Sequence, residues 1–148
     1  MKIETYSDLH YLDVVRLVEL FHKEAVSEYV GAFDLNVLIN TITGFKESQA
    51  ENCFLLTDDD GCHGILFGVM YKSPASERLM FQEMVWYVEP DYRKYGVKLL
   101  REVEKRLKLR QVGTIIMAVL ENSKTEKIKS FYQRLGYKPI EVHYARDL

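Results

Sequence analysis

A basic turn near the middle of the chain has the residue types that bind phosphate. An apolar run, residues 84–88, stops before Pro90, and a helical pattern begins at residue 97. The turn between them and the start of that helix contain Arg93, Lys94, Tyr95, Gly96, Val97 and Lys98. A strand that turns into a helix presents unpaired backbone N–H groups at the positive end of that helix, which suits a pyrophosphate. The alternative is an ordinary strand-turn-helix junction whose cations are solvated.

Other chemistry-bearing residue types form no competing site in the sequence. Its 4 histidines have no paired-ligand spacing, and no serine or lysine pattern indicates a covalent nucleophile. Cys53 and Cys62 lie in separate apolar segments without metal-ligand spacing, which favours structural thiols in a reduced protein and leaves a bridge between adjacent strands open. The acidic run 58–60 lacks the further carboxylates of a calcium loop. We therefore expect no metal.

Length, charge and hydropathy predict one domain, residues 1–148, without nucleic-acid or membrane partners. A chain of this size buries about 70% of its unfolded surface and needs no disulfide or metal to fold. A net charge of -2, with 20 basic and 22 acidic residues interspersed, gives no electrostatic footprint for nucleic acid or an anionic membrane. Residues 1–5 lack a signal-peptide core, and no stretch approaches the ~20 apolar residues of a membrane span. These features predict a cytoplasmic protein and leave a homodimer open.

The spacing of apolar residues predicts the elements that position the basic turn. Strands are expected over residues 1–6, 52–57, 62–71, 79–89, 114–120 and 137–145. Helices are expected from Ser7-Asp8 to near Gly31, over 35–42 with Gly44 as the stop, over 97–111 and over 125–135. Antiparallel hairpins followed by a βαβ-like unit predict an α/β fold, with a mixed, mostly antiparallel twisted sheet of six to seven strands and helices on both faces.

The order of elements and three residue sets together resemble the GCN5-related N-acetyltransferase superfamily, the small acyl-CoA-dependent transferases. The first set, residues 88–96, is similar to the family's strand end and cofactor signature R/Q-x-x-G-x-G/A, with Arg93 and Gly96 in the matching places. This resemblance implies that backbone N–H groups of the turn hold the pyrophosphate of acetyl-CoA. Lys98 departs from the signature, since it either hinders close approach or brings its ammonium to a phosphate oxygen.

The other two sets imply an acid and a base. Residues 131–137 resemble the family segment F-Y-x-x-L-G-F/Y, in which the tyrosine matching Tyr132 often protonates the leaving thiolate of CoA. The alternative is that Tyr132 belongs to the buried face of an amphipathic helix. Glu83 occupies the position of the base carboxylate of some family members, and would take the proton of the incoming amine. The alternative for Glu83 is an exposed charge at a strand end.

The resemblance also implies where the rest of acetyl-CoA lies. The splayed edge of the strand at Trp86, Tyr87 and Val88 would bind the pantetheine amides and supply an N–H to the oxyanion. Asn122 matches an asparagine near the pantetheine arm, or caps the last helix. The resulting hypothesis is direct acetyl transfer from acetyl-CoA to a primary amine of an unidentified acceptor. A catalytically weak CoA-binding or regulatory module, and an interaction protein with this fold and no cofactor, are the alternatives.

Overall fold

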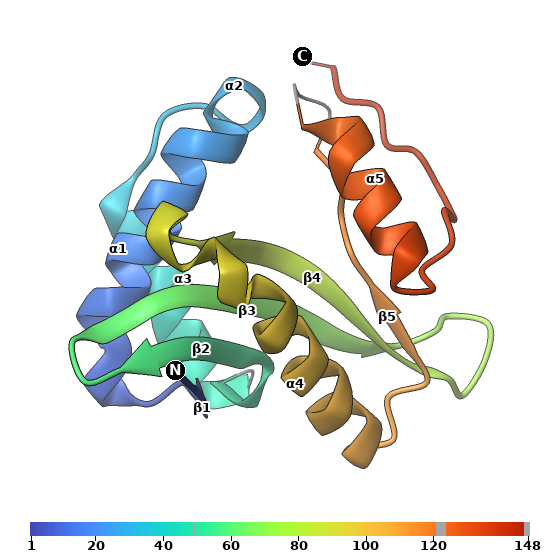
Figure 1. Ribbon diagram of the computed structural model, residues 1–148, viewed down its shortest axis with the longest axis horizontal. Coiled ribbons are helices and arrows are strands. Elements are labelled where there is room, and N and C mark those ends of the chain that lie inside the picture. The colour runs from blue at the N-terminus through green and yellow to red at the C-terminus, as the bar shows by residue number, and fades with distance from the viewer. Residues whose placement is uncertain (49, 121–123, 147–148) are drawn as a thin grey trace.

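The computed structural model describes residues 1–48, 50–120 and 124–146 and is built on one mixed sheet (Figure 1). The strand order is β1-β2-β3-β4-β5, antiparallel between the first four strands and parallel between the last two. The strands are β1 (Lys2–Thr5), β2 (Cys53–Asp58), β3 (Gly61–Lys72), β4 (Leu79–Val88) and β5 (Thr114–Ile116). The predicted mixed, mostly antiparallel sheet is confirmed. The predicted number of six to seven strands is wrong, because the described ranges contain five.

Helices cover both faces of the sheet, as predicted (Figure 1). On the first face lie η1 (Asp8–His10), α1 (Tyr11–Phe21), the π-helical turn η2 (His22–Val26), α2 (Ser27–Val30) and α3 (Leu35–Ser48), which leads through η3 (Ala50–Asn52) into β2. On the second face lie α4 (Gly96–Leu109), which follows the 3-10 helix η4 (Pro90–Tyr95), and α5 (Thr125–Arg134). None of these helices, within the described ranges, combines the length and hydropathy needed to cross a bilayer.

Two apolar cores form because β2 and β3 are buried on both sides. Leu55 and Ile65 pack with the first-face helices, whereas Leu56 and Leu66 pack with α4, and all four are at most 1% exposed. Successive side chains of a strand point to opposite faces, so a strand covered on both faces reads as a continuous apolar run. The central strands are therefore rigidly held, and they position β4 beside them.

The two N-terminal helices differ in detail from the prediction. The first is interrupted by the π-turn η2, whose C-cap Ser27 returns the chain to α2, so one continuous helix to Gly31 is not formed. The second begins where the side chain of Asp34 accepts hydrogen bonds from the N–H groups of Asn36 and Val37 at 2.8 and 3.1 Å. It continues past Gly44, since a single glycine costs a helix only about 1 kcal/mol.

The last predicted strand is absent and β5 is short. β5 ends at Ile116 instead of residue 120, and residues 137–145 run beside α5 without strand structure (Figure 1). Ile140, Val142 and Tyr144 alternate as in a strand, yet they are 67–95% exposed. Alternation describes which way side chains point, whereas a strand also needs a neighbour with which to pair. Within the described residues this segment has none.

The two cysteines are buried and free. The register places Cys62 opposite Thr57 and Cys53 opposite Phe67, so the thiols belong to different rungs of the β2–β3 ladder. A disulfide requires Cα atoms within about 7 Å of each other, so the bridge that the sequence left open between these strands does not form. Burial raises the pKa of each thiol to about 12, which keeps both protonated.

Candidate active site

The two edges of β4 are paired very differently at the centre of the candidate site. Toward β5 the parallel ladder covers Met80 to Gln82 only, opposite Thr114 to Ile116. Beyond that point the chain after β5 leads away from β4 toward the start of α5 (Figure 1). Within the described residues, the backbone of β4 after Gln82 thus has no strand partner on this side, and an unpaired strand edge of this kind can pair with an extended ligand.

A bulge in β4 sets the direction of the side chains along this edge. The register with β3 passes from Val85 opposite Phe67 to Glu83 opposite Gly68, so Met84 has no partner. A Cβ on Gly68 would lie 2.4 Å from the Gln82 carbonyl oxygen, so only glycine fits beside the bulge. Because a bulge inserts one residue, Glu83 and Trp86, three positions apart, share the sheet face that also carries Tyr132.

Glu83 is a buried carboxylate and not the exposed strand-end charge of the alternative interpretation. It is 8% exposed, and its Oε2 accepts a hydrogen bond of 2.9 Å from the N–H of Ala118. Burial raises its pKa to about 7, although the Ala118 bond opposes that shift. A carboxyl group with a pKa near neutrality can take up a proton at working pH and release it again, as a general base must.

Tyr132 approaches the same residue, Ala118, from α5, at the next peptide group along the chain. It is 7% exposed, and its hydroxyl donates to the carbonyl oxygen of Ala118 over 3.4 Å, a long and weak bond. Burial raises the pKa of the phenol, and the nearby Glu83 carboxylate raises it further. The side chain is therefore a phenol that keeps its proton until a strong base forms beside it. Its position is compatible with both interpretations of Tyr132, as a proton donor and as a packed helix residue.

Trp86 lies between these groups and the basic turn. Its ring centroid is 6.0 Å from the rings of Phe131 and of Tyr132, and its buried Nε1 donates to no acceptor within the described part of the chain. A buried N–H without a partner is uncommon in proteins and is satisfied when a ligand supplies an acceptor. The neighbouring Tyr87 and Val88 are each 8% exposed and belong to opposite cores.

The basic turn is a 3-10 helix that runs directly into α4. The N–H of Gly96 donates to the carbonyl of Arg93, and no side chain caps the start of α4. A Cβ on Gly96 would meet only Trp86 and Val88, at 3.8 and 3.9 Å, which is ordinary contact. Packing against protein neighbours therefore does not require glycine here. Gly96 is itself buried, and a residue without a side chain allows another group to approach the turn closely.

The cations of the turn lie in different directions. Lys94 lies over the ring of Tyr95, with its Nζ 5.2 Å from the centroid, and Val97 is 42% exposed. The Nζ of Lys98 donates to the Met1 carbonyl at 2.6 Å. Lys98 lines a concavity of about 410 Å³ with Lys2, Ile3, Arg101, Glu102, Lys105 and Arg106. In this structure Lys98 thus lies on a basic surface of α4 and β1, and it does not fill the space between the diverging strands.

Arg93 and Lys124 both contact Glu24, a residue that the sequence analysis missed. Nη2 of Arg93 lies 2.5 Å from Oε1 of Glu24 in η2, and Lys124 contacts the same oxygen at 3.1 Å. These residues are 69 and 100 positions from Glu24 along the chain, so no local motif could indicate the cluster. Ala118 was missed for the same reason, because its backbone serves the site and its side chain carries no chemistry. Asn122 lies outside the described residues.

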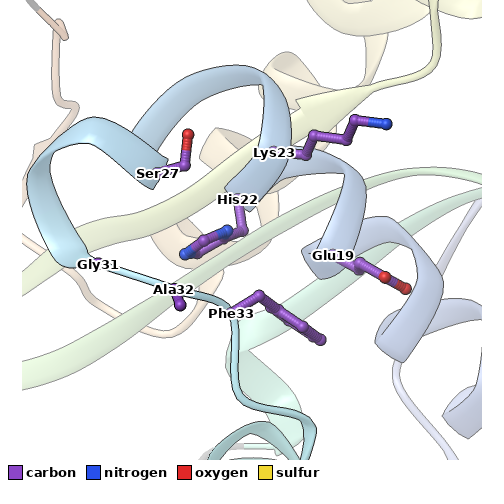
Figure 2. A pocket seen from close by; sticks show the side chains of 7 residues that line it. All are labelled: Glu19, His22, Lys23, Ser27, Gly31, Ala32 and Phe33. Atoms are coloured by element: carbon purple, nitrogen blue, oxygen red, sulfur yellow. The ribbon is translucent and has the colours of Figure 1, made fainter.

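A separate pocket of about 490 Å³ opens beside the N-terminal helices (Figure 2). It is lined by Glu19, His22, Lys23, Ser27, Gly31, Ala32 and Phe33. The rings of His22 and Phe33 meet edge to face, with centroids 5.5 Å apart. The pocket includes none of the predicted site residues. Among the described residues, no group of three or more His, Cys, Asp or Glu side chains is arranged to hold a metal ion.

Comparison with known proteins relates this geometry to a fold family. No protein-family model matches the chain, and a search of curated proteins finds no relative. Solved structures do match. An aminoglycoside acetyltransferase from an uncultured soil metagenomic sample aligns with a TM-score of 0.74 and 13% identity, covering 99% of this chain and 97% of that one. Glucosamine-6-phosphate N-acetyltransferase from Arabidopsis thaliana aligns with a TM-score of 0.73 and 10% identity, with the same coverage.

A third match shows how far this similarity reaches. A transcriptional regulator from Bacillus halodurans C-125 aligns with a TM-score of 0.72 and 14% identity, covering 99% of both chains. One fold can host several functions, so similarity at these identities establishes architecture and leaves activity to the site. The chain has the fold of the GCN5-related N-acetyltransferases, and the resemblance seen in the sequence is confirmed at that level.

Proposed function

We propose that this protein is an acetyltransferase that moves an acetyl group from acetyl-CoA directly to a primary amine. The observation that supports this most strongly is that a buried carboxyl group, Glu83, and a buried phenol, Tyr132, bond the N–H and the carbonyl oxygen of Ala118 at the place where β4 and β5 part. Acetyl transfer to an amine needs a group that accepts a proton and a group that donates one. The two side chains have these opposite capacities.

The two proton transfers bracket the bond changes. Glu83, in its ionised form, takes a proton from the ammonium of the acceptor, directly or through a water. The free amine nitrogen then forms a bond to the thioester carbonyl carbon, the C–S bond breaks, and the nitrogen loses its second proton to solvent water as the amide forms. Tyr132 gives its proton to the departing thiolate, which leaves as a thiol, and the phenolate is reprotonated from solvent. No side chain becomes acylated in this order of steps, which agrees with the lack of a nucleophile motif in the amino-acid sequence.

The unpaired edge of β4 provides for the thioester and its pantetheine arm. Backbone groups after Gln82 face no strand, and the Nε1 of Trp86 has no acceptor among the described residues. An amide-containing chain laid along this edge would satisfy the backbone groups as an added strand does. Holding the thioester beside Glu83 and Tyr132 contributes to the rate by orientation, because the reacting atoms no longer need to meet by diffusion.

The turn at residues 93–98 would hold the diphosphate of acetyl-CoA. Gly96 adds no side chain that would hinder a ligand, Arg93 supplies a guanidinium, and among the described residues no side chain caps the start of α4. The N-terminal end of a helix attracts anions through its free amides and its dipole. Lys94, Tyr95, Val97 and Lys98 belong to the same segment, with Lys98 in the structure directed to Met1 instead.

Release of CoA thiol from acetyl-CoA in the presence of a panel of amines tests this function. The panel would contain amino sugars, polyamines, amino acids and lysine peptides. Wild-type protein should turn over at least one of them, and Tyr132→Phe should reduce kcat by about 10²-fold or more, as expected for loss of a general acid. Tyr144→Phe is the control for the same chemical change, because that side chain is 95% exposed.

Two outcomes would contradict the proposal. If CoA raises the melting temperature by mass action but no amine is acetylated, the protein is a CoA-binding module. If millimolar CoA causes no thermal shift, the fold serves an interaction without this co-substrate. Equal rates for Tyr132→Phe and wild type would assign Tyr132 to packing alone.

A further inference from the structure

One carboxylate holds two cations at the end of β4. Oε1 of Glu24 accepts from Nη2 of Arg93 at 2.5 Å and from Nζ of Lys124 at 3.1 Å. Burial and the charge of Glu24 raise the pKa of Tyr87, so that hydroxyl lies near the same carboxylate. Glu24 comes from the first helical layer, Arg93 from the basic turn and Lys124 from the start of α5. The cluster therefore joins segments from both faces of the sheet.

The cluster of Glu24, Arg93 and Lys124 has the net positive charge that a binding site for an anion needs. Two cations and one carboxylate leave an excess of positive charge, and both cations converge on a single oxygen. The hydrogen bonds and charges of Lys124 and Arg93 lower the pKa of Glu24 despite its partial burial, so the carboxylate is ionised at neutral pH. A phosphate oxygen is an anionic hydrogen-bond acceptor, as a carboxylate oxygen is, and arginine and lysine bind both.

A soluble ligand can reach the cluster. The side chains of Arg93, Glu24 and Lys124 are 45%, 37% and 54% exposed, and Arg93 also belongs to the turn that would hold a diphosphate. Glu24 stands within the π-turn η2. A π-turn shifts the direction of the side chains that follow it and is frequent at functional sites. Here it lies in the segment that presents Glu24 to the two cations.

We propose that Arg93 and Lys124 clamp the diphosphate of CoA, and that Glu24 occupies this clamp as an internal substitute when CoA is absent. The inference rests on the function proposed above and deepens it. CoA must displace the Glu24 carboxylate from both cations before its own phosphates can bind them. Glu24 thus lowers the affinity for CoA and keeps the first helical layer attached to α5 in the free protein.

The expected size of the effect is modest. Ion pairs as exposed as these contribute at most a small stabilisation each, so removing the competitor should tighten CoA binding by about three- to tenfold. Calorimetric titration of CoA into wild type, Glu24→Gln and Glu28→Gln measures this. Glu28 lies on α2 one turn further along and is exposed, which makes its variant the matched control for charge. Glu28→Gln should bind CoA as wild type does.

Truncated ligands identify the group that competes with Glu24. Dephospho-CoA keeps the diphosphate and should show the same gain in Glu24→Gln, whereas pantetheine, which has no phosphate, should show none. Adding Lys124→Gln to Glu24→Gln should remove most of the gain for CoA. A gain for CoA that is missing for dephospho-CoA would assign the clamp to the 3′-phosphate and overturn the diphosphate assignment.

The results separate this inference from the proposed function. If CoA binds wild type, and binds Glu24→Gln with the same or a weaker affinity, the internal-substitute role of Glu24 is overturned. The transferase proposal then stays intact. A gain for pantetheine equal to that for CoA overturns the role as well. Failure of CoA to bind wild type and every variant overturns the proposed function itself. Binding only in Glu24→Gln supports the inference in its strongest form.

Discussion

The two edges of β4 show how one strand can serve structure on one side and chemistry on the other. Toward β3 the register continues from Leu79 to Val88, interrupted only at the bulge. Toward β5 it stops after Gln82. An unpaired strand edge is usually a liability, because its backbone groups invite other strands. The unpaired part of this edge begins at the buried Glu83, and it is there that the proposed extended ligand would bind.

The open edge is held by side chains instead of backbone. Glu83 bonds the N–H of Ala118 and Tyr132 bonds its carbonyl oxygen, so the segment after β5 is tied to β4 and α5 without a ladder. The closed edge has its own side-chain network at its end, where His63 bonds Asp58 and Glu89. The predictions that follow test whether the first network is catalytic and the second structural.

Replacing Glu83 should have the largest effect. Glu83→Gln keeps the shape and the hydrogen bond from Ala118 but cannot accept a proton, so turnover of amine should fall by about 10²- to 10⁴-fold. Steady-state kinetics measure the loss. Glu77→Gln, a change in the loop before β4 at a 91% exposed side chain, is the control and should leave kcat unchanged. Retention of more than half the activity would assign proton removal to water or to another residue.

The pH dependence of stability should reveal the same carboxyl group. In the folded protein its pKa is about 7, whereas in the unfolded chain it is near 4.5, so the folded state holds the proton over this interval. Stability therefore falls as pH rises, by about 2–3 kcal/mol between pH 5 and 8. Urea denaturation at several pH values measures the slope. In Glu83→Gln this part of the slope should vanish, and an unchanged slope would contradict the raised pKa.

The bulge in β4 should tolerate no side chain at the position of Gly68 in β3. In Gly68→Ala the new Cβ would overlap the Gln82 carbonyl and the Phe81 ring, so the free energy of unfolding should fall by about 1–3 kcal/mol. Gly44→Ala, in α3 with nothing within 4 Å, is the control and should raise stability by about 0.5–1 kcal/mol. Equal stability of Gly68→Ala and wild type would mean that the strands can separate at the bulge.

His63 on the closed edge should give the smallest effect and none on catalysis. Hydrogen bonds that its ring donates to the carboxylates of Glu89 and Asp58 raise its pKa despite burial. Arg16 also pairs with Glu89, and Tyr92 stacks on the imidazole. A raised histidine pKa contributes stability below pH 6.5 that is lost as pH rises through the folded-state value. His63→Gln should cost about 1 kcal/mol at pH 6 and less at pH 8, with kcat unchanged.

A second histidine variant tests whether the loss of stability in His63→Gln comes from its hydrogen bonds to Asp58 and Glu89 or from replacing any histidine. His143 is 76% exposed and pairs only with Glu141 among the contacts described, so His143→Gln should leave stability unchanged at both pH values. A large loss of turnover in His63→Gln would join the closed edge to the catalytic machinery and weaken the comparison between the two edges.

Much of the fold could be predicted because its patterns are local. The hairpin between β2 and β3, the bounds of β4 and the helix that ends before Gly136 follow from turn residues and apolar spacing. The candidate residues Glu83 and Tyr132 were predicted from short motifs. The end of β5 and the missing last strand were not, because pairing depends on a neighbour that local alternation does not specify.

The sequence by itself determined which residue types are present at the turn, on β4 and on α5, and therefore the kind of chemistry open to this protein. Only the tertiary structure decided that Glu83 and Tyr132 meet at Ala118, that Lys98 reaches Met1 and that Glu24 holds Arg93 and Lys124. The physical reason is separation along the chain. Local spacing sets the direction of a side chain on its own element, whereas partners far away in sequence are chosen by how sheet and helices pack.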